Sequence, residues 1–185
     1  MSTTKKLVTC AMLVALGTVL SLIHIWNLPN GGTITAASMV PIVIIPYLFG
    51  FRYGIISAFV FALLEMIALT INTPPSSTFL NWTLVVFLDY ILAFTVLGLG
   101  TLFTKNAIIG SVIVVFLRLV CHFVSGIIVW GVFAAPGQSV LAYSAIYNAS
   151  FMIPEMIITA VVVAILVKIP GIPWAAKQKT LNIPQ

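Results

Sequence analysis

The chain has 185 residues, of which 62% are hydrophobic and 6% are Asp, Glu, Lys or Arg, and its formal net charge is +5. A soluble domain of this length needs far more polar surface, so this composition excludes a soluble globular protein and predicts a polytopic membrane protein. The basic residues are scattered rather than gathered on one face, so the positive charge does not indicate nucleic-acid binding.

Six apolar segments follow one another along the chain, and they predict a single membrane domain over residues 1–185. A helix that crosses a bilayer needs about 20 apolar residues. Five segments are long enough, whereas the second is short and contains two prolines. We expect an all-α integral membrane protein with six transmembrane helices, and five as the alternative. The expected helices are residues 7–24, 38–50, 53–72, 79–103, 107–134 and 140–168.

The basic residues mark alternate ends of these segments. They precede the first segment, separate the second from the third and the fourth from the fifth, and follow the last one. The other three connections, near 25–37, 73–78 and 135–139, contain no Lys or Arg. Because Lys and Arg concentrate in cytoplasmic loops, both termini are expected to be cytoplasmic, which favours six spans over five. The residues concerned are Lys5, Lys6, Arg52, Lys105, Lys168, Lys177 and Lys179.

The first segment carries small residues at helical spacing. Ala11 and Ala15 lie four residues apart and therefore on one helix face, with Gly17 nearby. Small residues at this spacing let a second helix approach closely within a membrane. Taken alone, the pattern favours packing within the same chain.

Three carboxylates, Glu65, Asp89 and Glu155, lie inside the apolar segments, where Arg118 is the one basic residue. A charged side chain at the bilayer centre costs roughly 2.5 to 3.5 kcal/mol, so intramembrane acids indicate a function. We expect Arg118 to pair with a carboxylate, with Glu155 favoured as its partner; Glu65 is the alternative, or could line a site. After this pairing the apolar segments still contain more acidic than basic groups, unless burial keeps the carboxyl groups neutral. The sequence does not determine their protonation.

The fifth segment repeats functional side chains every four residues. Arg118, His122, Gly126 and Trp130 therefore share one slowly drifting helix face. Taken singly, His122 could be satisfied by a backbone carbonyl and Trp130 could be an interfacial anchor. A face that combines these groups does not suit lipid, so we interpret it as the wall of a binding site.

The fourth and sixth segments add polar and aromatic residues to this set. Asp89 and Tyr90 are adjacent in the fourth, and Tyr143, Tyr147 and Asn148 cluster in the sixth. A carboxylate among aromatic rings suits an organic cation, because the carboxylate and the ring faces both attract positive charge. The alternative is that Tyr143 belongs to an aromatic belt and that Asn148 joins two helices by a hydrogen bond.

Several motifs of catalysis and nucleotide binding are missing from the sequence. It contains no GxxxxGK[ST] loop, no HExxH and no GxSxG. Its two cysteines, Cys10 and Cys121, are too few for a disulfide framework or a metal cluster. We therefore expect a protein that is not an enzyme and that has no metal or cofactor of its own.

Four ordered blocks of sequence carry a resemblance to a known family. They are PNGGTITAASMVP at 29–41, LDYILAFTVLGLGTLF at 88–103, RLVCHFVSGIIVW at 118–130 and YSAIYNASFMIPE at 143–155. With these blocks the chain resembles the thiamine-specific substrate-binding (S) components of energy-coupling factor (ECF) transporters, the ThiT or YuaJ family. The resemblance covers nearly the whole chain and implies the six-helix ECF S-component fold in a prokaryotic plasma membrane.

The resemblance implies thiamine, a permanent cation, as the transported ligand. Asp89 would face its positive charge with Tyr90 beside it, and His122 and Trp130 would lie against its rings.

The resemblance also implies that Tyr143 and Asn148 form hydrogen bonds to the ligand. Gly32 would belong to a loop after the first helix that closes over the site. Some members have a tryptophan in that loop where this chain has Gly32 and Thr33, and Trp26 could replace it only if the loop folds inward.

The same resemblance gives Ala11 and Ala15 a docking role. In S components this face meets a transmembrane coupling subunit that works with two ATPase subunits, so ATP would be used by those partners. The alternatives are an S component for another vitamin or precursor, such as hydroxymethylpyrimidine or pyridoxine, and a stand-alone proton-coupled carrier of organic cations.

Overall fold

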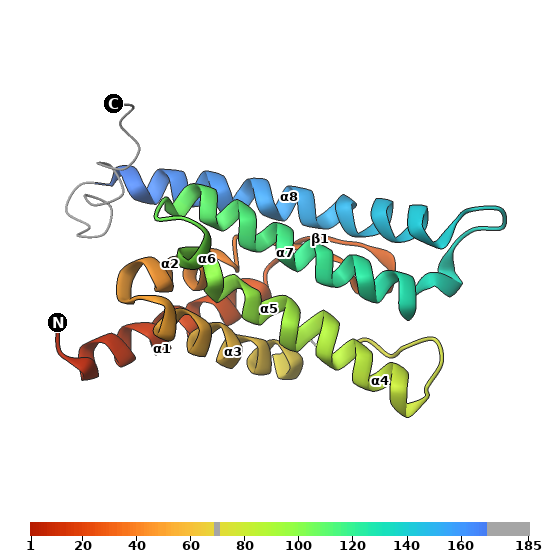
Figure 1. Cartoon of the computed structure of the whole chain (residues 1–185), viewed down its shortest axis with the longest axis horizontal. Coiled ribbons are helices and arrows are strands. Elements are labelled where there is room, and N and C mark those ends of the chain that lie inside the picture. The colour runs from red at the N-terminus through yellow and green to blue at the C-terminus, as the bar shows by residue number, and fades with distance from the viewer. Residues whose placement is uncertain (69–70, 170–185) are drawn as a thin grey trace.

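A bundle of roughly antiparallel helices forms the molecule, and the computed structural model describes residues 1–68 and 71–169 (Figure 1). A two-stranded antiparallel sheet follows the first helix. The α-helices are α1 (Thr3–Ser21), α2 (Val40–Phe49), α3 (Phe51–Ala68), α4 (Phe79–Val85), α5 (Ala93–Thr95), α6 (Gly100–Phe103), α7 (Ala107–Ile128) and α8 (Val140–Lys168). The strands are β1 (His24–Asn27) and β2 (Thr33–Thr35), and the shorter helical turns are η1 (Pro29–Gly31), η2 (Val86–Leu92), η3 (Val96–Leu99) and η4 (Gly131–Phe133).

Polar side chains start the long helices at the points where the apolar segments begin. Ser2, Thr78, Asn106 and Ser139 each accept a hydrogen bond from a backbone N–H in the first turn of the following helix. Such caps satisfy N–H groups that have no partner within the helix. The expected helix over 140–168 matches α8, whereas the one expected over 107–134 ends at Ile128.

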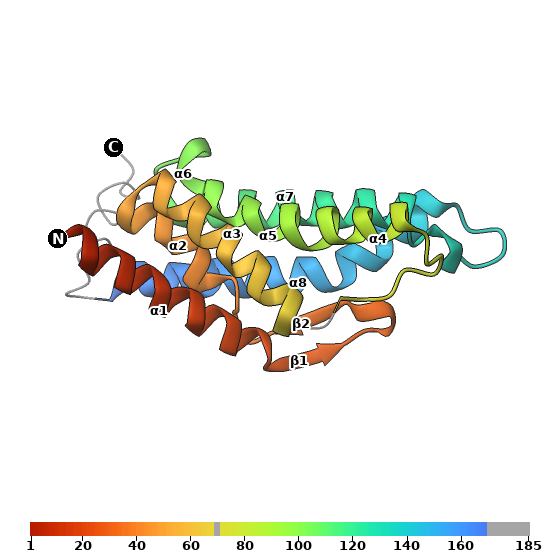
Figure 2. The ribbon, with the colours of Figure 1, turned by 90° about the horizontal axis from the view of Figure 1, so that it is seen from below.

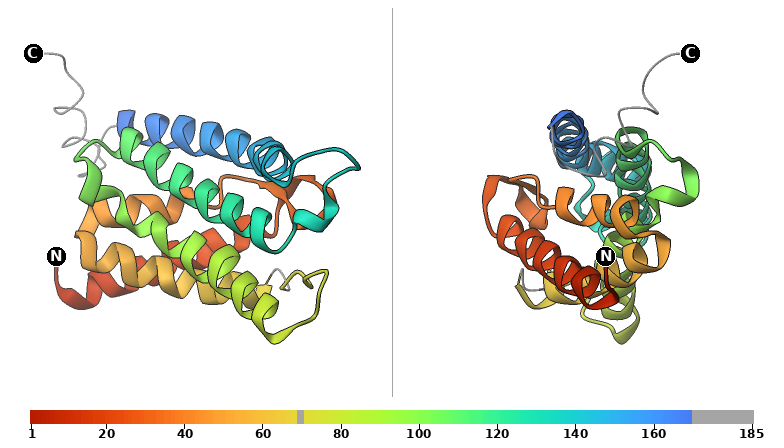
Figure 3. Two further views of the ribbon diagram at one scale, coloured as in Figure 1. Left: turned by 45° about the vertical axis from the view of Figure 1, so that its right-hand side comes forward. Right: turned by 90° about the vertical axis from the view of Figure 1, so that its left-hand side faces the viewer.

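Five helical segments in the described part of the chain are long and apolar enough to cross a membrane, and α2 is a sixth, shorter one. The ten residues of α2 span about 15 Å, or roughly half of a bilayer core. Seven consecutive residues of α2, Val40 to Pro46, are buried. In the end view α2 lies inside the bundle, in contact with α1, α3, α7 and α8 (Figure 3).

The span expected over 79–103 is one apolar segment but not one regular α-helix. It changes from α4 to a π-helix in η2, returns to α in α5, tightens to a 3-10 turn in η3 and ends in α6. The segment expected over 53–72 begins two residues earlier, at Phe51, and its helix ends at Ala68. Residues 69 and 70 lie outside the described part.

A β-hairpin replaces the expected end of the first helix, which makes the expectation of an all-α chain incomplete. α1 ends at Ser21, and β1 pairs with β2 in the register Asn27 to Thr33, with an irregularity between His24 and Trp26. Asn30 and Gly31 both adopt positive φ angles, of 64° and 94°, and reverse the chain. We call residues 24–35 the hairpin segment. It lies beyond the end of α1, and its second strand contacts α8 (Figure 2).

The direction of the helices agrees with the expected orientation. The start of α1 and the end of α8 lie at the same end of the bundle (Figures 1 and 2), so the chain crosses an even number of times. The α2–α3 and α6–α7 connections lie at this end too; Arg52 is in the first turn of α3 and Lys105 is in the α6–α7 connection. Since this end holds the basic residues, it is the cytoplasmic one, and the hairpin segment lies toward the outside. Lys177 and Lys179 are outside the described residues.

Candidate functional site

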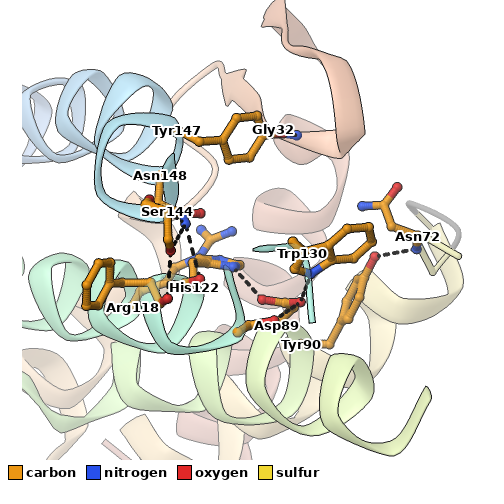
Figure 4. Close-up of polar contacts among 12 residues, drawn as sticks. Gly32, Asn72, Asp89, Tyr90, Arg118, His122, Trp130, Ser144, Tyr147 and Asn148 are labelled. Atoms are coloured by element: carbon orange, nitrogen blue, oxygen red, sulfur yellow. Dashed lines mark hydrogen bonds and ion pairs between the residues drawn. The ribbon is translucent and has the colours of Figure 1, made fainter. Parts of the chain in front are cut away.

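A cavity of about 200 Å³ lies between the hairpin segment, η2, α7 and α8. All ten residues that the sequence analysis places in a binding site line this cavity. They are Gly32, Asp89, Tyr90, Arg118, His122, Gly126, Trp130, Tyr143, Tyr147 and Asn148. Four segments far apart in sequence thus meet at one place (Figure 4).

Asp89 is the acidic residue of the cavity, and the π-helix η2 presents it. A π-helical turn shifts the side chains that follow relative to a regular α-helix, and such turns concentrate at functional sites. The Asp89 side chain is 13% exposed. It therefore lies at the cavity wall and is not enclosed in the protein core.

Three donors from α7 and the turn after it hold the Asp89 carboxylate (Figure 4). Oδ1 lies 3.0 Å from His122 Nδ1, while Oδ2 accepts from Ser125 Oγ at 2.6 Å and from Trp130 Nε1 at 3.1 Å. Trp130 comes just after α7, in a turn whose geometry still directs its indole toward the cavity. The sequence did not single out Ser125, although it follows His122 by three residues and so lies on nearly the same helix face.

Arg118 lies at the inner side of the cavity and, within the described residues, has no carboxylate partner. Its Nε donates to His122 Nε2 at 3.4 Å, its Nη1 lies 3.0 Å from Met39 Sδ, and its guanidinium stacks 4.0 Å above the Phe94 ring. Because Nε2 of His122 accepts, Nδ1 carries the proton and donates to Asp89.

The expected direct ion pair between Arg118 and a glutamate is wrong. Within the described residues, no carboxylate lies within ion-pair distance of Arg118, and the contact between His122 and Asp89 is a hydrogen bond. Glu65 and Glu155 are buried, at 0% and 2% exposed, and neither lines the cavity.

The wall formed by α8 is joined to α7 by polar side chains. Ser144 Oγ donates to the carbonyl oxygen of Phe123 at 2.7 Å, and Asn148 Nδ2 donates to that of His122 at 3.2 Å. Gly126 makes this contact possible, because a Cβ there would overlap Ser144 Oγ and lie 2.9 Å from Asn148 Nδ2.

Aromatic rings cover the rest of this wall. Tyr143 and Tyr147 are stacked with centroids 5.8 Å apart, and Phe151 packs edge-on against Tyr147 at the same separation. The cavity therefore presents ring faces and edges around a carboxylate, which is a suitable environment for a flat cation.

The hairpin segment closes the cavity on its outer side. The N–H of Gly32 donates to the Tyr147 hydroxyl at 2.9 Å, and that hydroxyl donates to the carbonyl oxygen of Pro29. A Cβ at Gly32 would lie 2.8 Å from the Phe151 ring, so only glycine allows the backbone so close to α8. Trp26 does not replace a loop tryptophan, since it is 66% exposed and does not line the cavity.

Several lining residues were not predicted from sequence. His24 lines the cavity from β1, and Asn30 and Thr33 line it from the same segment. Asn72 follows α3, and its N–H donates to the Tyr90 hydroxyl at 3.1 Å. In the sequence, the polar run NTPPSS after α3 indicates a structured connection that could have pointed to Asn72.

A second, apolar groove of about 310 Å³ lies between α1 and α3. Ala11 and Ala15 line one side of it, and both are exposed on the surface of the bundle. Ile56, Val60 and Leu64 line the other side. Ala11 and Ala15 are thus not used for packing inside the described part of the chain, whereas Gly17 is buried close to Ile42 and Phe61.

Comparisons with known proteins agree with one another. The family model described as "Thiamine transporter protein (Thia_YuaJ)" matches residues 7–171. The thiamine transporter ThiT of Bacillus subtilis is 30% identical over 179 residues, covering 87% of this chain and 89% of that protein. ThiT of Lacticaseibacillus paracasei is 30% identical over 106 residues, covering 49% and 53%.

Solved structures show the same fold. ThiT from Listeria monocytogenes superimposes with a TM-score of 0.72 at 20% identity, covering 97% of both chains. The S component of a bacterial ECF transporter superimposes with a TM-score of 0.61 at 22% identity, covering 98% of this chain and 100% of that one. The chain has the ECF S-component fold and apolar helices that cross the cell membrane several times, and the family model matches most of its length. This chain therefore belongs to the ThiT/YuaJ family of thiamine transporters.

Proposed function

We propose that this chain is the substrate-binding component of an ECF-type vitamin importer and that it captures thiamine in the cavity around Asp89. The observation that carries the proposal is a carboxylate inside a ring-lined cavity, held by side chains that the sequence had already placed together. The relatives named as thiamine transporters support the choice of ligand.

The charges near the cavity favour a cation. The Arg118 guanidinium stacks on the Phe94 ring and lies beside Met39 Sδ, so it does not pair with Asp89. Asp89 is bound by donors that are neutral in this arrangement, His122, Ser125 and Trp130, so its negative charge is not cancelled. In surroundings of low dielectric this charge attracts a thiazolium ring more strongly than it would in water.

The aromatic wall would orient the rings of the ligand. Trp130 and His122 contribute ring surfaces on the α7 side, and Tyr143 and Tyr147 on the α8 side. The Tyr143 hydroxyl and the Asn148 amide would form hydrogen bonds to the polar edge of the pyrimidine. Asp89 would oppose the thiazolium charge.

The position of the cavity favours capture from outside. The hairpin segment covers it, and the basic residues that identify the cytoplasmic end lie at the opposite end of the bundle. Delivery inward requires energy, for which this sequence carries no P-loop. We assign the energy source to a transmembrane coupling subunit with two ATPase subunits, which would dock on the groove that Ala11 and Ala15 line.

Binding and accumulation can be measured separately. The purified chain should bind thiamine saturably in detergent, and liposomes that contain the chain alone should not accumulate it. Uptake driven by a pH gradient in those liposomes would instead indicate a stand-alone carrier. Competition with pyridoxine and with the separate pyrimidine and thiazole halves of thiamine tests the ligand: tighter binding of any of these would contradict the assignment.

A further inference from the structure

Two of the three buried acids do not take part in the cavity. Glu65 and Glu155 are almost fully buried, and in each the Oε1 oxygen is hydrogen-bonded while Oε2 has no partner within the described part of the chain. Burying a carboxylate in a membrane protein is costly, so such residues require a reason. Ligand contact does not supply it, because neither residue lines the cavity.

Glu155 holds the end of the hairpin segment. Its Oε1 accepts from both the backbone N–H and the hydroxyl of Thr35, the latter at 2.7 Å. Thr35 is the last residue of β2 and is 5% exposed. Ser38 adds a hydrogen bond to the Thr35 hydroxyl at 2.7 Å. The carboxylate on α8 is therefore bound directly to the chain where it leaves the hairpin.

Glu65 holds the chain just before the same segment. Its Oε1 accepts from the hydroxyl of Ser21 at 2.7 Å, and Ser21, the last residue of α1, is 1% exposed. Ile23 and Ala36 then join the two ends of the hairpin through a backbone hydrogen bond of 3.1 Å. The carboxylate on α3 is thus bound to the chain where it enters the hairpin.

Between these two points the segment has little burial of its own. All four residues of β1 are exposed, and contacts between the tip and the rest of the bundle include Gly32 with Tyr147. Yet this segment supplies the outer wall of the cavity through Asn30, Gly32 and Thr33. Tyr147 holds the tip, and Leu28 and Ile34 pack against the core, while the bonds at Ser21 and Thr35 hold the two ends.

We propose that Glu65 and Glu155 are positioning residues that hold the two ends of the hairpin segment and so keep it closed over the cavity; this rests on the function proposed above. Removing one partner of a buried hydrogen bond leaves the other partner unsatisfied, which costs more than the bond itself contributes. The acids stabilise the closed site without touching the ligand.

The first test measures how fast bound thiamine dissociates. Glu155→Met removes the acceptor at similar size, Ser21→Ala removes the donor to Glu65, and Thr35→Val removes one of the two donors to Glu155. Loss of a buried hydrogen bond, with its partner left unsatisfied, should speed dissociation roughly ten- to a hundredfold. Glu155→Gln keeps an acceptor oxygen and should restore slow dissociation. Thr159→Val is the control, since its buried hydroxyl, one turn further along α8, has no partner within the described residues.

The second test reports on the hairpin itself. Spin labels are placed separately at Ile25 on β1 and at Ile146 on α8, both exposed, after Cys10 and Cys121 are replaced by alanine. The Glu155→Met change should increase label mobility at Ile25 and leave it unchanged at Ile146. General loosening of the bundle would increase mobility at both.

These outcomes separate the two proposals. Parent-like dissociation and parent-like mobility at Ile25 in both Glu155→Met and Ser21→Ala would overturn the role of the anchors. A parent protein that fails to bind thiamine would refute the proposed function, while label mobility would still show whether the acids hold the hairpin.

Discussion

Replacing Asp89 with asparagine removes the negative charge of the cavity and changes little in shape. At about 4 Å and an effective dielectric constant of about 20, two unit charges attract each other by about 4 kcal/mol. Because every 1.4 kcal/mol or so corresponds to a factor of ten in Kd, we expect Asp89→Asn to bind thiamine about a thousandfold more weakly. The amide NH₂ would also face donors of Ser125 and Trp130, which adds to the loss.

A neutral ligand of the same shape isolates the charge. Calorimetric titration of the parent and of Asp89→Asn should use thiamine and an analogue in which an uncharged thiophene replaces the thiazolium ring. The variant should lose far more affinity for thiamine than for the analogue, for which we expect a change of about tenfold or less, the worth of one neutral hydrogen bond. Equal losses for the two ligands would refute the assignment of Asp89 as the partner of the positive charge.

Three other changes test separate parts of the structure. Trp130→Phe keeps a ring but removes the 3.1 Å hydrogen bond to Asp89, so thiamine should bind roughly tenfold more weakly by titration; unchanged affinity would mean that the indole N–H has no part in binding. Gly126→Ala forces a methyl group against Asn148 between α7 and α8 and should lower the free energy of unfolding by about 1 to 3 kcal/mol. The thermal midpoint in detergent should fall, and an unchanged midpoint would contradict the close packing. Ala11→Leu fills the exposed groove and should abolish co-purification with the coupling subunit without changing thiamine affinity; intact co-purification would place docking elsewhere.

The sequence predicted which residues line the site better than the backbone conformations that position them. A four-residue spacing was enough to align Arg118, His122 and Gly126, because α7 is a regular helix through all three. Trp130 reaches the same cavity although α7 has already ended. The π-helix that presents Asp89 has no sequence pattern of its own, because its hydrogen bonding depends on the packing around it.

The hairpin segment was missed for a related reason. HIWN and TIT are short, and their strand conformation comes from their pairing with each other and from the contact of β2 with α8, which is distant in sequence. The ion pair expected for Arg118 is absent because Glu65 and Glu155 bind Ser21 and Thr35, while the guanidinium lies on Phe94. The sequence identified the charged residues inside the apolar segments, but which partner each of them binds depends on residues that are distant in sequence.

A crystal structure of the protein with thiamine bound tests the central claim most directly. The account predicts one thiamine molecule in the cavity under the hairpin segment, with its thiazolium ring beside the Asp89 carboxylate and its rings against Trp130, His122 and the α8 tyrosines. Thiamine bound outside this cavity, or bound inside it with the thiazolium ring turned away from Asp89, would contradict the account.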